Sequence, residues 1–81
     1  MIIQLLGSSA CPNCRELEAS VRRTVAARGI PAEIRKVTDP TEIMASGVMG
    51  LPGLVIDGRV AVSGRVPSPE ELGRILDAAG A

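Results

Sequence analysis

Apolar runs and amphipathic stretches alternate along the chain and predict seven elements in the order strand, helix, strand, helix, strand, strand, helix. Residues 2–6 form a short apolar run that ends at a glycine and two serines, a pattern typical of a strand buried on both faces. Over residues 12–28, apolar positions recur at spacings of three and four, which predicts an amphipathic helix that Gly29 ends. The later elements are expected at residues 32–37 (strand), 40–47 (helix), 54–56 and 59–63 (strands) and 69–80 (helix).

Capping and turn signals place the boundaries of these elements. Asp39 and Ser68 are each followed by a proline and, three residues on, by a glutamate, which is the pattern of a helix N-terminus. An Asp57-Gly58 pair between two apolar runs is typical of a hairpin whose turn needs positive φ at both residues. The opening strand–helix–strand unit implies parallel neighbours, and the hairpin adds an antiparallel strand. The sequence therefore predicts an α/β fold with a mixed four-stranded sheet flanked by three helices.

The composition is consistent with one small domain, residues 1–81. The chain contains no Phe, Tyr or Trp, so Leu, Ile, Val, Met and Ala must build its core. Met44 and Met49 are expected to fill this core or a substrate groove rather than to ligate a metal. Ala79 is expected to share the inward face of the last helix with Leu72.

Charge and hydropathy exclude several classes of function. Nine basic and nine acidic residues cancel, which gives no electrostatic footprint for nucleic acid or an anionic membrane. No apolar stretch approaches the roughly 20 residues of a membrane span. No basic segment precedes the apolar N-terminal run, as one would in an export signal, so we expect a cytoplasmic protein, and we expect it to be a monomer. Because cytosolic thiols are kept reduced, a purely structural disulfide is disfavoured.

Cys11 and Cys14 are the only cysteines, and they fall where the first strand meets the first helix. A helix N-terminus stabilises a thiolate through its unpaired N–H groups and the positive end of its peptide dipoles. Two cysteines on one helical turn are also close enough to form a disulfide. Cys14 lies on the apolar face of the predicted helix and is expected to be more buried than Cys11. The motif therefore favours a reversible dithiol/disulfide pair.

A metal site is the alternative use of the same pair. Zinc usually takes four Cys or His ligands, and this chain has two Cys and no His, so a zinc site would need a second copy. Two thiolates suit Cu(I), so a soft-metal carrier of the copper type stays open as a rival function. Such carriers, however, run βαββαβ and end in a strand, whereas this chain is predicted to end in a helix.

The order of elements, with Cys-x-x-Cys after the first strand and Pro52 just before the third, resembles the thioredoxin fold. The resemblance covers nearly the whole chain and is closest to the small archaeal and bacterial thioredoxin-like proteins. Three stretches carry it: residues 7–14 with the Cys-Pro-Asn-Cys motif, residues 47–58 with the proline and the Asp-Gly turn, and residues 63–68.

The resemblance implies a thiol–disulfide oxidoreductase that needs no bound cofactor. Cys11 would attack a disulfide of a protein substrate, and Cys14 would resolve the mixed disulfide. Electrons would come from a flavin-dependent disulfide reductase or another thiol donor. The resemblance also implies a cis peptide before Pro52 and a substrate-binding surface. The residues expected on that surface are Pro12, Asn13, Leu51 and Pro52.

Three positions depart from the pattern of larger thioredoxins, and one of them is Leu51, which stands where they often have a threonine and makes the substrate groove more apolar. Ala10 stands where they have a tryptophan, and Leu5 stands where they commonly have a buried acid. Because no acid at the position of Leu5 can accept a proton, Cys14 must lose its proton by another route.

Overall fold

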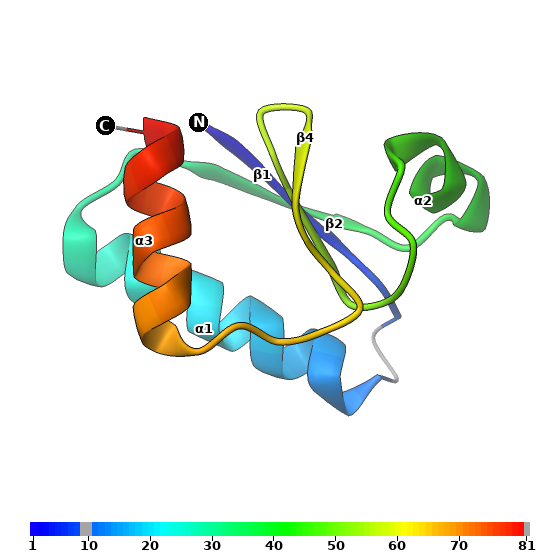
Figure 1. Cartoon of the computed structure of the whole chain (residues 1–81), viewed down its shortest axis with the longest axis horizontal. Coiled ribbons are helices and arrows are strands. Elements are labelled where there is room, and N and C mark those ends of the chain that lie inside the picture. Colours follow the sequence, from blue (N-terminus) through cyan, green and yellow to red (C-terminus); the bar gives the residue numbers. More distant parts are fainter. Residues whose placement is uncertain (9–10, 81) are drawn as a thin grey trace.

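The computed structural model describes residues 1–8 and 11–80, and within them it contains the seven elements in the predicted order (Figure 1). They are β1 (Ile2–Leu6), α1 (Pro12–Arg28), β2 (Glu33–Val37), α2 (Pro40–Ser46), β3 (Gly53–Ile56), β4 (Arg59–Ser63) and α3 (Pro69–Gly80). Every boundary lies within one residue of its predicted place. In this described part of the chain, no helix is long and apolar enough to cross a membrane.

The four strands form one mixed sheet in the order β2-β1-β3-β4, as predicted. β1 runs parallel to β2 and antiparallel to β3, and β4 returns antiparallel to β3. Asp57 (φ 48°) and Gly58 (φ 83°) form the turn between β3 and β4, with positive φ at both residues as the hairpin signal required. A register shift between Leu54 and Val55 leaves Gly53 opposite Ser63 at the far end of this hairpin.

The predicted caps begin and end the helices. The carboxylate of Asp39 accepts a hydrogen bond from the backbone N–H of Thr41 at 2.9 Å, at the start of α2. The hydroxyl of Ser68 accepts one from the backbone N–H of Glu71 at 3.1 Å, at the start of α3. Gly29 ends α1 in the left-handed conformation.

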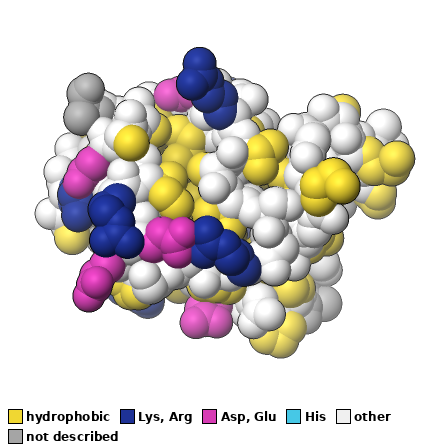
Figure 2. All heavy atoms as spheres, viewed as in Figure 1, with side chains coloured by type: hydrophobic (Ala, Val, Ile, Leu, Met, Phe, Trp, Pro, Cys, Tyr) yellow, Lys and Arg dark blue, Asp and Glu magenta, His cyan; other side chains and the backbone are white. Residues whose placement is uncertain are grey.

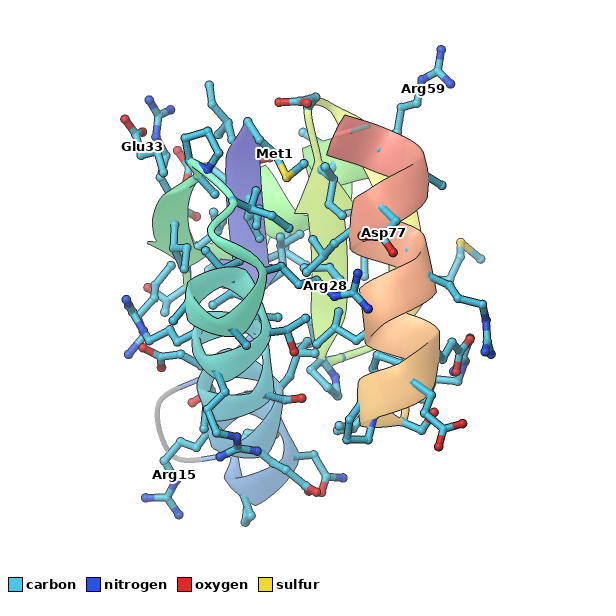
Figure 3. All side chains as sticks on the ribbon, turned by 90° about the vertical axis from the view of Figure 1, so that its left-hand side faces the viewer. Met1, Arg15, Arg28, Glu33, Arg59 and Asp77 are labelled. Carbon is cyan, nitrogen blue, oxygen red and sulfur yellow. The ribbon has the colours of Figure 1, made fainter. Side chains whose placement is uncertain are left out.

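Helices cover both faces of the sheet, with α1 and α3 on one face and α2 on the other (Figure 1). The main core lies under α1 and α3 and is wholly aliphatic. Its most completely buried side chains include Ile3, Leu17, Val21, Leu54, Leu72 and Leu76. A smaller cluster on the other face is formed by Leu6, Val37 and Val55, against which Ile43 and Val48 pack. An ion pair between Arg28 and Asp77, at 2.5 Å, joins α1 to α3 (Figure 3).

Three apolar residues that were candidates for the core lie outside it, and for Met49, which is close to Leu51 in the sequence, the expected substrate groove stays a prediction. Met44 and Met49 are 80% and 94% exposed, and Ala79 is also exposed. α2 has only seven residues and directs Ile43 to its small cluster, so the next position, Met44, turns toward solvent. Figure 2 shows exposed hydrophobic side chains over the α2 end of the molecule, whereas charged side chains gather on the α3 side.

Candidate active site

The two cysteines lie at the N-terminus of α1, on the first turn. Cys11 is the N-cap residue, with extended backbone, and its sulfur accepts a hydrogen bond from the backbone N–H of Cys14 (N···S 3.2 Å). The backbone N–H of Cys11 in turn donates to the carbonyl of Ser8 at 3.1 Å. The end of β1 and the start of α1 therefore fix the position of Cys11, and its sulfur occupies the place of a capping oxygen.

The surroundings of the two thiols shift their pKa values in opposite directions. The pKa of Cys11 is lowered, first by the hydrogen bond with Cys14, then by backbone N–H groups of Cys14 and Asn13 and by the charge of Arg15. The pKa of Cys14 is raised, first by desolvation and then by its interactions with Cys11. Figure 3 shows Arg15 at this end of α1, directed away from the body of the molecule. The arrangement thus favours a thiolate at Cys11 and a thiol at Cys14.

Cys14 was predicted to be more buried than Cys11, but in the structure both side chains are partly exposed. Desolvation is nevertheless the largest influence on the pKa of Cys14, whereas hydrogen bonds outweigh it at Cys11. Ala10, which stands where larger thioredoxins have a tryptophan, lies outside the described residues.

A small cavity of about 20 Å³ adjoins Cys14, and Pro52 and Leu5 both line it. The structure therefore brings Cys14 and Pro52 together from positions 38 residues apart. Glu18 and Lys36 also line this cavity, and their side chains form an ion pair at 3.3 Å. A cavity of this size has room for a single water molecule.

Gly7 is a site residue whose role the sequence did not reveal. A Cβ at this position would lie 2.3 Å from the sulfur of Cys14, far inside ordinary contact. The end of β1 can approach Cys14 so closely only because Gly7 has no side chain. The available signal was a glycine directly after the first strand, which indicates either a turn or a close approach.

The segment before β3 has the form that the resemblance implied. The Leu51–Pro52 peptide is cis, with Pro52 buried and Leu51 46% exposed. Pro12 and Asn13 are exposed on the first turn of α1. Ser63 is a second residue that the sequence did not single out, and its hydroxyl bonds to the backbone of this segment.

Comparison with known proteins agrees with this geometry. A family model described as Thioredoxin domain matches residues 1–77. The chain belongs to the thioredoxin family. A thioredoxin of Methanothermobacter thermautotrophicus is 42% identical over 76 residues, which cover 94% of this chain and 97% of the relative. A thioredoxin of Methanocaldococcus jannaschii is 39% identical over 72 residues, covering 89% of this chain and 81% of the relative.

A solved structure supports the fold independently. "Structure of a malarial protein" superposes with a TM-score of 0.71, covering 99% of this chain and 97% of that chain at 14% sequence identity. At that identity the likeness concerns the fold alone. It agrees with the predicted thioredoxin fold and its mixed sheet.

Membership of the thioredoxin family makes the chain a redox protein of the thiol–disulfide oxidoreductase class, with its cysteines spaced as Cys-x-x-Cys. The rival function, a soft-metal carrier, receives no support from these relatives. Across residues 1–8 and 11–80, no group of three or more His, Cys, Asp or Glu side chains could hold a metal ion.

Proposed function

We propose that the protein exchanges its Cys11–Cys14 dithiol with disulfides of protein substrates through a mixed disulfide. The Cys11 thiolate attacks one sulfur of the substrate disulfide, and the substrate S–S bond breaks as the Cys11–substrate bond forms. The other substrate sulfur leaves as a thiolate. Cys14 then loses its proton and attacks the Cys11 sulfur, which releases the second substrate thiolate and leaves a Cys11–Cys14 disulfide. Two electrons pass from the protein to the substrate.

The unequal environment of the two sulfurs carries this proposal. The sulfur of Cys11 accepts a hydrogen bond from the backbone N–H of Cys14, and the pKa of Cys11 is lowered, whereas desolvation raises the pKa of Cys14. The thiolate is the nucleophile in thiol–disulfide exchange, so attack begins at Cys11. Cys14 lies one turn along the same helix, and this closeness to Cys11 supports its role as the resolving thiol.

The proposed substrate-binding surface combines Pro12 and Asn13 on α1 with Leu51 and Pro52 before β3. Among the described residues, the backbone N–H and C=O of Leu51 have no hydrogen-bond partner. These two groups can therefore pair with an extended segment of the substrate, as in β-strand addition. The half-exposed Leu51 side chain gives this surface an apolar character.

The exchange needs no bound cofactor, but the oxidised pair must be reduced again. We propose a flavin-dependent disulfide reductase or another thiol donor as the source of electrons, because a second thiol–disulfide exchange at Cys11 restores the dithiol with balanced electrons. A cytoplasmic location, a monomeric state and a single domain over residues 1–81 stay predictions.

Trapping of the intermediate tests the assigned roles. Cys14→Ser is expected to accumulate a mixed disulfide between Cys11 and a protein substrate such as insulin, visible as a mass increase that dithiothreitol removes. Cys11→Ser is the matched control and is expected to trap nothing, because desolvation, the largest cause of the raised pKa of Cys14, persists in this variant. Equal trapping by both variants, or by neither, would reject the assignment. Tight uptake of one Cu(I) per chain without reduction of insulin by the wild type would favour the metal carrier.

A further inference from the structure

The hydroxyl of Ser63 ties the segment before Pro52 to the edge of the sheet. Ser63 is the last residue of β4, an edge strand, and its oxygen accepts hydrogen bonds from two successive backbone N–H groups. The N–H of Met49 lies 2.8 Å from this oxygen and that of Gly50 lies 3.0 Å from it. A hydroxyl oxygen has two acceptor lone pairs, so both are used on this one segment.

Two further contacts hold the same segment close to the end of β4. The backbone N–H of Gly64 donates to the carbonyl of Pro52 at 3.0 Å. The backbones also meet directly, since a Cβ on Gly50 would lie 3.2 Å from the Cα of Gly64. The backbone of residues 49–52 therefore lies against that of residues 63 and 64 and is held there by these contacts.

Side-chain packing contributes little to the position of this segment. Met49 is 94% exposed, Gly50 has no side chain, and Leu51 is about half exposed. Only Val48 and Pro52, at the two ends, have partly or fully buried side chains. Between these ends, hydrogen bonds rather than buried apolar surface must hold the backbone, and Ser63 accepts two of them.

We infer that Ser63 is a positioning residue for substrate recognition, because it fixes the segment that presents Leu51. This inference rests on the proposed exchange with protein disulfides. Ser63 occupies the N–H groups of Met49 and Gly50, and the next backbone N–H without a hydrogen-bond partner, among the described residues, is that of Leu51. The serine thereby decides which residue of the segment pairs with an extended substrate. It touches neither thiol, so the chemical step at Cys11 does not depend on it.

A comparison of a protein substrate with a small disulfide separates substrate recognition at Leu51 from the chemical step at Cys11. A protein disulfide lies in an extended chain that can pair with Leu51, whereas hydroxyethyl disulfide offers only its two sulfurs to Cys11. Loss of the Ser63 hydroxyl is expected to raise KM for insulin about three- to tenfold, the range that one net hydrogen bond supports. The second-order rate with hydroxyethyl disulfide is expected to stay at its wild-type value.

The decisive pair of variants is Ser63→Thr and Ser63→Val, whose new side chains have the same shape and differ in the hydroxyl. S63T keeps the hydroxyl acceptor and is expected to retain the wild-type KM for insulin, while S63V shows the increase. Ser68→Ala is the positional control: it removes a hydroxyl acceptor from the start of α3 and is expected to leave KM unchanged. Thermal melts of all three variants identify any general loss of structure.

Each outcome has one meaning. Equal KM for insulin in S63T and S63V would overturn the inference, and so would an equal loss of rate with both disulfides in S63V. If S63V does not fold, Ser63→Gly, which also lacks the hydroxyl, replaces it in the comparison. A wild type that fails to reduce insulin above the rate of dithiothreitol alone would instead reject the proposed function.

Discussion

Replacement of Gly7 by alanine tests whether close contact between β1 and α1 sets the position of Cys14. The added Cβ would lie 2.3 Å from the Cys14 sulfur and 3.1 Å from its Cβ, and ordinary contacts begin at 3.4 Å. The sulfur must therefore move by about 1 Å, or the strand must separate from the helix. The helix cannot easily retreat, because Leu17, one turn further on, is buried in the main core. The strand cannot either, because the N–H of Gly7 donates to the carbonyl of Val37 at 3.0 Å.

The expected magnitude follows from this overlap. An extra methyl group in a packed site costs roughly 1–3 kcal/mol. For a domain of this size, that range lowers the melting temperature of the reduced protein by roughly 4–24 °C. The displaced sulfur of Cys14 also attacks Cys11 less effectively, so we expect Gly7→Ala to accumulate the mixed disulfide with insulin even though both cysteines are present.

Gly29→Ala is the matched control for this experiment. Gly29 adopts φ 64° at the end of α1, and no atom lies within 4 Å of its missing Cβ. Alanine in that left-handed conformation costs roughly 1–2 kcal/mol without touching either thiol. The control is therefore expected to lose stability and still resolve the mixed disulfide at the wild-type rate. Wild-type stability and resolution in Gly7→Ala, or equal accumulation in Gly29→Ala, would refute the reasoning.

Two further predictions concern the pH dependence of the site and the stability of the core. The rate at which iodoacetamide alkylates Cys11, measured by the mass of the modified peptide, is expected to rise with pH through a midpoint below the ordinary cysteine pKa. Arg15→Gln is expected to raise that midpoint only slightly, because the Arg15 charge is the weakest of the influences on the pKa of Cys11. The pKa of Cys11 is lower in the folded protein than in the unfolded chain. Cys11 therefore stabilises the reduced protein at pH values above its unfolded pKa, and this stabilisation is lost as the pH falls through its folded pKa. A urea unfolding midpoint that rose as the pH fell through this range would contradict the prediction. Leu72→Ala shortens a fully buried side chain and is expected to lower the free energy of unfolding, measured by urea titration, by about 2–5 kcal/mol. Met44→Ala, at an exposed position, is expected to change this free energy by less than about 0.5 kcal/mol. Similar losses in the two variants would show that the assigned core is wrong.

The elements and the cysteine pair were predictable because their signals are local. The caps at Asp39 and Ser68 and the Asp57-Gly58 turn each act over a few neighbouring residues. The position of the cysteines at a strand–helix junction is also visible from neighbouring residues. By contrast, Met44 was placed wrongly because its side of α2 depends on how a very short helix packs, which periodicity over seven residues does not determine.

Gly7 and Ser63 were not predictable because their contacts depend on register and on close approach. Counting back from the hairpin turn without interruption would place Val62, rather than Ser63, opposite Gly53. The register shift between Leu54 and Val55 adds one residue to the count, and a one-residue slip exchanges the two faces of a strand. The bulge therefore brings the Ser63 hydroxyl to the segment before Pro52. No local pattern in the sequence predicts this bulge.

The site also suggests how Cys14 can be deprotonated at the right moment without a buried acid. Leu5, which stands in the place of that acid, is buried and lines the cavity beside Cys14, so this position supplies no proton acceptor, and the carboxylate of Glu18 in the same cavity is paired with Lys36. Desolvation is the largest cause of the raised pKa of Cys14, and the Cys11 sulfur raises this pKa further, through their hydrogen bond and through its charge. In the proposed reaction, formation of the mixed disulfide removes that charge, and the pKa of Cys14 falls. The resolving thiol therefore becomes easier to ionise after Cys11 has reacted, while desolvation, the largest cause of its raised pKa, persists.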